Sequence, residues 1–374
     1  MDYRDTQEEA QFRAALREWL QQNVAEWNVD ASTSARAGSD KEWHRRLYEA
    51  GYVGMSWPVE YGGRGLSPLY EAILNDELAR ADAPPYSAAN HIGRAIWTHG
   101  TDEQQRRFLT PTLRGDISWC QGFSEPEAGS DIASLRTHAS LDGDQWIING
   151  QKLWGMHPGT DWCFLLARTE PELPRHKGIS ALFVPMDSPG LTCRSIQMSS
   201  WEHAVGEAFF DDVRVPADHI LGARGDGWRI AMTTFAYERG AGDVGSFTKY
   251  QKMLGRLESL ADERGRLSEP ELRRQLSLAY TLGEALRLNI VEELSKRVAG
   301  RPPGSEGSVG KLLWSDAEQT IGHIAMDLLG PDAVLGLAPD WLANYLYSRA
   351  ASVYGGTSQI QKNLLAQRVL GLPR

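Results

Sequence analysis

The segment VYGGTSQIQKN, residues 353–363, is the most informative stretch of this chain for the fold. Its two consecutive glycines, Gly355 and Gly356, suit a turn or the C-terminal cap of a helix, because glycine adopts left-handed backbone conformations at no steric cost. Long amphipathic helical patterns surround the segment from about residue 225 onward. The turn is therefore expected within a helical C-terminal region.

The hydrophobic pattern changes twice along the chain. Apolar residues first recur at helical spacing, as in Phe12, Leu16 and Leu20. Short runs rich in β-branched and aromatic residues come next, separated by Gly, Asp and Pro, which is typical of strands. Helical patterns then return. This order predicts an α+β multidomain protein, with an N-terminal helical domain (1–115), a central β-domain (116–222) and a C-terminal helical bundle (223–374).

Composition limits the possible functions. The hydrophobic fraction of 41% and the charged fraction of 24% are ordinary for a globular protein, and no apolar run reaches the length of a membrane-spanning helix. A net charge of −10 argues against non-specific nucleic-acid binding. The polar start MDYRDTQEEAQF lacks the features of a signal peptide, so a cytoplasmic location is expected. Three well-separated cysteines, Cys120, Cys163 and Cys193, favour neither a zinc site nor a disulfide framework, and no metal is expected.

Six motifs in a fixed order connect the chain to a known family. They are WPVEYGG (57–63), GTDEQQRRFL (100–109), GFSEPEAGSD (122–131), INGQKLW (148–154), FFDDVRVP (209–216) and GGTSQIQKNLLAQRVLGLP (355–373). With these motifs the chain resembles the acyl-CoA dehydrogenases over nearly its whole length. The resemblance implies a central β-barrel-like domain, a C-terminal four-helix bundle, FAD as cofactor and an acyl-CoA thioester as substrate. It also implies an electron-transfer flavoprotein as electron acceptor and a dimer of dimers that shares its flavin sites.

The resemblance assigns a set of flavin-binding residues. They are Gln121, Phe123, Ser124, Gly129, Ser130, Trp154, Gly155, Met156, Thr357 and Gln359. Ser130 is also expected near the substrate. Trp154 is expected to shield the flavin ring. The family supplies a hydroxyl near flavin N5 where this chain has Met156, so the backbone N–H groups of Gly155 or Met156 are expected there instead.

The catalytic base is displaced relative to many family members. They carry a glutamate where this chain has Gly355, and the α-proton of the substrate needs a positioned carboxylate. A branch that includes isovaleryl-CoA and steroid-type enzymes carries the base on an earlier helix, as Glu followed by Arg, which matches Glu238 and Arg239 in FAYERGAG (235–242). Glu238 is therefore predicted to be the base. Gly355 is predicted to keep a backbone donor for the thioester carbonyl, while Arg239 is expected to contact CoA and Gly356 the substrate.

Two departures from the family's pattern at the shared FAD site leave the assembly and the activity open. The family's RxxFG pattern is missing between residues 243 and 275, and Asp327 stands where a glutamine helps to bind the neighbouring subunit's FAD. Similar changes occur in actinobacterial members that pair two different subunits into an α2β2 tetramer, so a homotetramer and a heterotetramer both stay open. The alternatives to an acyl-CoA dehydrogenase are a partner subunit that completes another chain's flavin site and a flavin oxidase or monooxygenase on this fold. An acyl group on a carrier protein could replace the CoA thioester.

Overall fold

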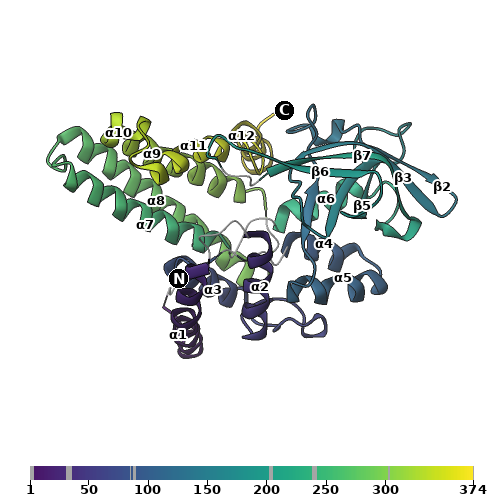
Figure 1. Ribbon diagram of the computed structural model, residues 1–374, viewed down its shortest axis with the longest axis horizontal. Helices are drawn as coiled ribbons and strands as arrows, with labels where there is room; N and C mark the ends of the chain where they lie inside the picture. Colours follow the sequence, from purple (N-terminus) through teal and green to yellow (C-terminus); the bar gives the residue numbers. More distant parts are fainter. Residues whose placement is uncertain are drawn as a thin grey trace.

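The computed structural model describes residues 4–30, 36–84, 86, 90–201, 205–237, 242–301 and 304–373. Helices, strands and helices follow in the predicted order, so the predicted α+β class is confirmed (Figure 1). The first helices are α1 (Gln7–Asp30), α2 (Arg36–Glu49), α3 (Pro68–Arg80), α4 (Asn90–His99) and α5 (Asp102–Arg114). The strands are β1 (Trp119–Gly122), β2 (His138–Asp142), β3 (Gln145–Trp154), β4 (Trp162–Arg168), β5 (Ile179–Pro185), β6 (Leu191–Ile196), β7 (Val205–Pro216) and β8 (Ile220–Leu221). The last helices are α6 (Gly227–Tyr237), α7 (Gly242–Glu263), α8 (Pro270–Val298), α9 (Gly307–Leu329), α10 (Pro331–Val334), α11 (Pro339–Ala351) and α12 (Ser358–Leu364).

Local sequence signals set the helix ends. The Thr101 hydroxyl accepts a hydrogen bond from the Gln104 N–H, and the Gln104 side chain accepts one from the Thr101 N–H, which forms a capping box at the start of α5. Gly115 ends the same helix with a φ of 77°, a conformation that glycine adopts readily. Among the described residues, no helix is both long and apolar enough to span a lipid bilayer.

The β-domain is one sheet with the strand order β6-β7-β3-β2-β4-β5-β8, and β1 pairs in parallel with β4. Strands β4 and β5 are buried on both faces. Phe164 and Leu166 join a core that includes Leu109 and Leu113 of α5, whereas Cys163 and Leu165 join the interior core of the sheet. The first helices and the sheet therefore share one hydrophobic core.

Helices α7 to α11 form the bundle that extends away from the sheet in Figure 1, whereas α6 packs beside the sheet. Its core is separate and repeats at helical spacing, with Leu254 and Leu257 from α7, Leu272 and Leu276 from α8, and Ile321 from α9. Trp341 of α11 closes one side of this core. The bundle is thus held by its own apolar interior.

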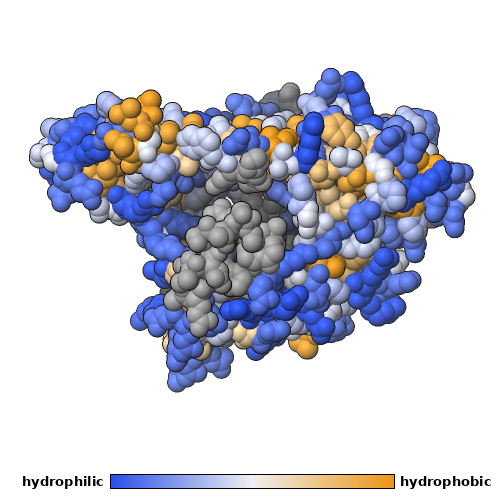
Figure 2. Space-filling model, viewed as in Figure 1, coloured by the Kyte–Doolittle hydropathy of each residue, from blue (hydrophilic) through white to orange (hydrophobic). Residues whose placement is uncertain are grey.

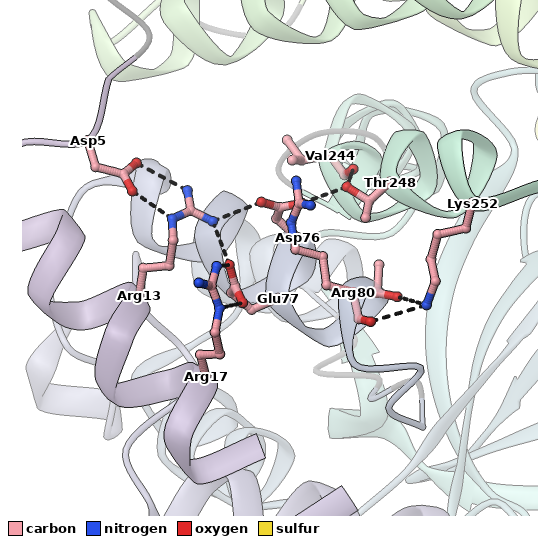
Figure 3. A network of polar contacts seen from close by, with 10 residues as sticks. Asp5, Arg13, Arg17, Asp76, Glu77, Arg80, Val244, Thr248 and Lys252 are labelled. Carbon is pink, nitrogen blue, oxygen red and sulfur yellow. Dashed lines mark hydrogen bonds and ion pairs between the residues drawn. The ribbon is translucent and has the colours of Figure 1, made fainter. Parts of the chain in front are cut away.

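A buried polar network joins α1, α3 and α7 (Figure 3). Arg13 Nη1 lies 2.8 Å from Asp76 Oδ2 and 3.0 Å from Glu77 Oε1, and Arg17 Nη2 lies 2.7 Å from Glu77 Oε1. Burial alone would raise the pKa of Glu77, but hydrogen bonds from Arg17 and Arg13 hold it below its usual value. On the bundle side, Lys252 Nζ of α7 lies 2.6 Å from Asp82 Oδ2, so the N-terminal helices are fixed to the bundle by charge as well as by packing.

Candidate active site

The loop after β1 is anchored from inside by a buried ion pair. Lys152 Nζ on β3 lies 2.8 Å from Glu125 Oε1, and the same amine donates to the Phe123 carbonyl oxygen at 3.1 Å. Glu125 also accepts the backbone N–H groups of Arg136 and Thr137 at 2.7 and 2.9 Å. Burial acts to raise the pKa of Glu125, but the Lys152 charge and these donors lower it overall, so the carboxylate stays ionised. This pair was not predicted from the sequence; its signal was the alternation in β3, in which Lys152 takes the same inward-facing positions as Trp146 and Ile148.

Gln121 presents a buried polar atom without a partner. Its Nε2 atom makes no hydrogen bond to any residue in the described part of the chain. Its backbone N–H donates to the Gly155 carbonyl oxygen at 3.0 Å, which ties β1 to the end of β3. A Cβ atom placed on Gly155 would lie 2.4 Å from the Gln121 carbonyl oxygen, so only glycine allows this approach. An amide donor left unpaired in a buried position is costly, which points to a ligand that pairs with it.

The rim beside Gln121 is open and rich in small residues. Gly129 and Ser130 are exposed, and nothing lies within 4 Å of a Cβ atom placed on Gly129. Ser124 is partly buried, and its carbonyl oxygen accepts the Leu153 N–H at 2.9 Å. Trp154 has a φ of 72° and leaves 53% of its surface exposed. An exposed indole held in a left-handed conformation offers a flat surface on which an aromatic ligand can pack.

Met156 points away from this rim. Its side chain is fully buried in the interior core of the sheet, and its Sδ atom lies 4.0 Å from Cys163 Sγ. The Gly155 N–H donates to the Leu153 carbonyl oxygen at 3.0 Å. Met156 can therefore contribute only main-chain atoms to a ligand on the rim, and the Gly155 N–H is already engaged within the chain. The expectation that a backbone N–H of Gly155 or Met156 replaces the missing hydroxyl stays a prediction.

The C-terminal end of helix α6 lies beside the loop that follows β1. Phe235 on α6 packs edge-to-face on Phe123, with ring centroids 5.6 Å apart and an interplanar angle of 87°. Tyr237 ends the helix, and Arg94 Nη2 donates to its hydroxyl at 3.2 Å. Glu238 and Arg239 follow directly in the sequence but lie outside the described residues. The last described turn of α6 thus lies beside the loop that begins at Phe123.

The two glycines of the opening segment form a left-handed turn between α11 and α12. Gly355 has a φ of 59° and Gly356 a φ of 86°. Gln361, which is 3% exposed, donates from Nε2 to the carbonyl oxygens of Gly355 and Gly356 at 3.0 and 3.4 Å. Thr357 caps α12 by accepting the Ile360 N–H at 3.2 Å, whereas Gln359 is exposed. Gln361 was missed in the sequence, since nothing in its spacing signals that it folds back onto the turn.

A second group of polar side chains lies behind this turn on α9. Lys311 Nζ is 4.4 Å from the centroid of the Tyr354 ring and donates to the Ala351 carbonyl oxygen. Glu318 Oε2 is buried and has no hydrogen-bond partner in the part of the chain that the structure describes. Burial raises the pKa of Glu318 to about 7, against the opposing charges of Lys311 and Arg349. None of this cluster was predicted from the sequence.

At the α7–α8 turn, the arginines are engaged within the chain. Arg264 Nη2 lies 2.5 Å from Asp332 Oδ2, and Arg266 Nη2 lies 2.8 Å from Glu269 Oε2. Arg266 Nη1 also donates to the Asp327 carbonyl oxygen at 3.2 Å, while the Asp327 side chain is exposed. Internal carboxylates therefore neutralise the positive charge of this turn.

The residues around the β1 loop fit a flavin. The unpaired Gln121 amide can donate to a ring carbonyl oxygen, the exposed Trp154 indole can pack on a planar ring, and the open segment at Gly129 and Ser130 can approach a phosphate closely. Together, the amide donor and the flat indole surface match the flavin ring, and the open backbone matches the phosphates of FAD.

Comparison with known proteins identifies the family. Three family profiles match: the N-terminal domain of acyl-CoA dehydrogenase over residues 6–116, its middle domain over 120–213 and its C-terminal domain over 225–370. The acyl-CoA dehydrogenase IpdE1 of Mycobacterium tuberculosis is 41% identical over 388 residues, covering 98% of this chain and 99% of the relative.

Solved structures give the same result. The Tcur3481-Tcur3483 steroid ACAD superposes with a TM-score of 0.87 at 29% identity, with all of both chains covered. The ChsE4-ChsE5 complex of Mycobacterium tuberculosis superposes with a TM-score of 0.85 at 28% identity, again over all of both chains. The chain belongs to the acyl-CoA dehydrogenase family and is an FAD-dependent oxidoreductase.

Proposed function

We propose that this chain catalyses the α,β-dehydrogenation of an acyl-CoA thioester, with Glu238 as the base that removes the α-proton. The observation that carries the proposal is the contact between Phe235 and Phe123, because it holds the end of α6 against the loop expected to bind the flavin. A base that directly follows α6 in the sequence is therefore proposed to act beside the flavin, with no carboxylate needed at Gly355. When bound, FAD would supply the acceptor for the hydride from the β-carbon, and the Glu238 carboxylate would take the α-proton as the double bond forms.

In this proposal the VYGG turn supports the thioester. The Gly355 N–H donates to the carbonyl oxygen, whose negative charge grows as the α-proton leaves. Gln361 fixes the carbonyl oxygens of Gly355 and Gly356 and thereby holds the peptide planes of the turn. Gln121, Phe123, Ser124, Gly129, Ser130, Trp154, Gly155, Met156, Thr357 and Gln359 are proposed to contact FAD. Ser130, Arg239 and Gly356 are proposed to contact the substrate.

The decisive experiment is Glu238→Gln, which removes the basic oxygen and keeps the size of the side chain. We expect rapid flavin bleaching by a good acyl-CoA under anaerobic conditions to fall by at least about 1,000-fold, while FAD stays bound. Glu263→Gln, an exposed position near the end of α7, is the matched control and should reduce like the native protein. Near-native reduction in Glu238→Gln would remove Glu238 from this role.

A bulky acyl group and an electron-transfer flavoprotein as acceptor complete the proposal. Glycine at 355 leaves room that a glutamate would fill, and one structural neighbour is described as a steroid ACAD. A panel of linear, branched and polycyclic acyl-CoAs tests the substrate class. Turnover with an electron-transfer flavoprotein but not with oxygen would support a dehydrogenase, whereas oxygen consumption would show the oxidase alternative.

A second candidate role concerns the assembly. We infer that this chain pairs with a different subunit, because Arg264 and Arg266 are neutralised internally and so offer little positive charge to a neighbour's FAD. Val334, Leu335 and Leu337 are 85%, 70% and 70% exposed and form part of the apolar patch at the free end of the bundle (Figure 2), a surface suited to a partner chain. Both structural neighbours described above are named as pairs of chains.

Purification of the chain alone and with a second family member from the same organism tests this pairing. A flavin content near one per pair of chains in the mixed complex, with little flavin in the chain alone, is the expected result. One flavin per chain in a homotetramer would contradict it.

A further inference from the structure

Arg94 on α4 stacks on two aromatic rings, that of Trp97 on its own helix and that of Tyr237 at the end of α6. Its Cζ atom lies 4.3 Å from the centroid of the Trp97 ring and 4.6 Å from that of Tyr237. Its Nη2 atom donates to the Tyr237 hydroxyl at 3.2 Å. Within the described residues, no carboxylate forms an ion pair with Arg94, and this is the one hydrogen bond that its guanidinium group makes.

This environment differs from that of the structural arginines of the same protein. Arg13 and Arg17 pair with buried carboxylates, as Figure 3 shows. A guanidinium group has five N–H donors in a rigid fork that matches a carboxylate or carbonyl oxygen. In Arg94 most of these donors have no partner among the residues that the structure describes, and the two rings remove part of the group from water. A cation that is oriented, partly desolvated and unpaired is ready for a ligand with an oxygen acceptor.

The position of Arg94 connects it with the proposed active site. Tyr237, which it contacts, is the residue before Glu238, and Phe235 of the same helix turn packs on Phe123. The guanidinium group therefore lies beside the end of α6 that leads into the proposed base. Arg239, the residue expected to contact CoA, follows on the chain itself, whereas Arg94 approaches from a different helix.

His91 adds a second polar group on the same face of α4. It precedes Arg94 by three residues, a spacing that places two side chains on one side of a helix. Burial lowers the pKa of His91 to about 4, so its ring is neutral at pH 7. It has no hydrogen-bond partner within the described part of the chain. A neutral imidazole and an arginine together can hold an oxygen acceptor without adding a second charge.

We propose that Arg94, assisted by His91, selects acyl chains that carry an oxygen acceptor, a carboxylate or a ketone, away from the thioester. The inference rests on the proposed dehydrogenase function and deepens it, because it names the chemistry of the acyl group. Plain hydrocarbon acyl chains would leave the Arg94 donors unpaired, and a partly desolvated charge without a partner lowers affinity.

The test compares two acyl-CoAs of equal carbon number, one with a remote ketone or carboxylate and one with a plain alkyl end. Arg94→Met keeps the apolar stem that packs between the rings and removes every donor. We expect the preference for the oxygenated substrate, measured as the ratio of kcat/KM values, to fall by about 10- to 100-fold. Arg94→Lys should recover part of the preference for the carboxylate and less of that for the ketone, because a lysine lacks the planar fork.

Arg107→Met is the matched control. Arg107 also stacks on two aromatic rings, those of Phe108 and Trp162, but it lies on α5. It should leave the preference unchanged. An equal loss for both substrates in Arg94→Met would show that Arg94 only holds Tyr237 in place, and no loss for either would show a simple contact between helices. Both results overturn the proposal.

Calorimetric binding of non-reacting analogues of the two acyl-CoAs to the holoenzyme separates this inference from the proposed function. If the native protein binds both analogues but reduces with neither acyl-CoA, the dehydrogenase proposal fails while the ratio of dissociation constants still reports on Arg94. A native protein that binds the oxygenated analogue no more tightly than the plain one would overturn the role of Arg94 regardless of catalysis.

Discussion

Thr248 on α7 donates its hydroxyl proton to the Asp76 carboxylate on α3 across 2.6 Å, and both side chains are buried. The Asp76 carboxylate also forms an ion pair with Arg13 of α1. One carboxylate therefore joins α1, α3 and α7. We expect Thr248→Val, which keeps the shape of the side chain, to lower the free energy of unfolding by about 1 kcal/mol. Urea unfolding followed by far-UV circular dichroism measures the change. Thr281→Val, an exposed threonine on α8, should change it by less than about 0.5 kcal/mol, and an equal loss in both would argue against a specific link.

Gln121→Leu should weaken FAD binding without lowering the free energy of unfolding of the flavin-free protein. The amide nitrogen has no partner to lose within the described residues, so the flavin-free protein should keep its stability to within about 0.5 kcal/mol. The dissociation constant for FAD should rise by about 10-fold, because one buried hydrogen bond to the ligand is removed.

Gln151→Leu on β3 is a control that should show the reverse pattern to Gln121→Leu. Its Nε2 atom donates to Glu207 Oε2 at 3.0 Å, so this variant should lose stability and retain FAD. Fluorescence titration of released flavin and urea unfolding give the two readings. Unchanged FAD affinity in Gln121→Leu would place the flavin elsewhere.

Glu125→Gln should be strongly destabilising. The change leaves the fully buried Lys152 ammonium without its carboxylate, and removal of one partner of a buried pair costs about 3–5 kcal/mol. FAD occupancy should fall as well, because Glu125 also anchors the loop that follows β1. The double variant Glu125→Gln with Lys152→Met removes the isolated charge and should recover part of the loss. Strict additivity of the two single changes would show that the pair is not coupled.

Glu318→Gln should change the pH dependence of stability. The folded pKa of about 7 lies above the ordinary value, so the protonated carboxyl favours the folded state fully below about pH 4.5, and this contribution is lost as pH rises through 7. Between pH 5 and 8 the native holoenzyme should lose roughly 2 kcal/mol more unfolding free energy than Glu318→Gln, a value reduced for the partial exposure of the group. Asp316→Asn, an exposed position on the same helix, should keep the native slope. Identical slopes for Glu318→Gln and the native protein would refute the shift.

The architecture could be predicted from the sequence because its signals are local. Helical spacing around Leu16 and Leu20, and the short β-rich runs that became β4 and β5, identify elements without any knowledge of their neighbours. The family motifs in turn predicted FAD as the cofactor.

The interior of the site was less accessible to such reasoning. The Glu125–Lys152 pair joins a loop to a strand 27 residues later, and Gln361 reaches back to carbonyl groups of the preceding turn. Glu318 approaches Tyr354 from another helix. The inward direction of Met156 likewise depends on how the sheet closes around it. Such contacts are set by tertiary packing, which no periodicity in one segment encodes.

The two strands that are buried on both faces also determine how the molecule comes apart. Because β4 and β5 complete the core of the first helices on one side and that of the sheet on the other, neither layer can open without exposing the interior of its neighbour. The bundle keeps a core of its own and is tied to the first helices through α7, so α8 and α9 can open without exposing that shared interior. Hydrogen exchange should therefore find two cooperative units rather than three, with the amides of α5, β4 and β5 opening together and those of α8 and α9 opening separately.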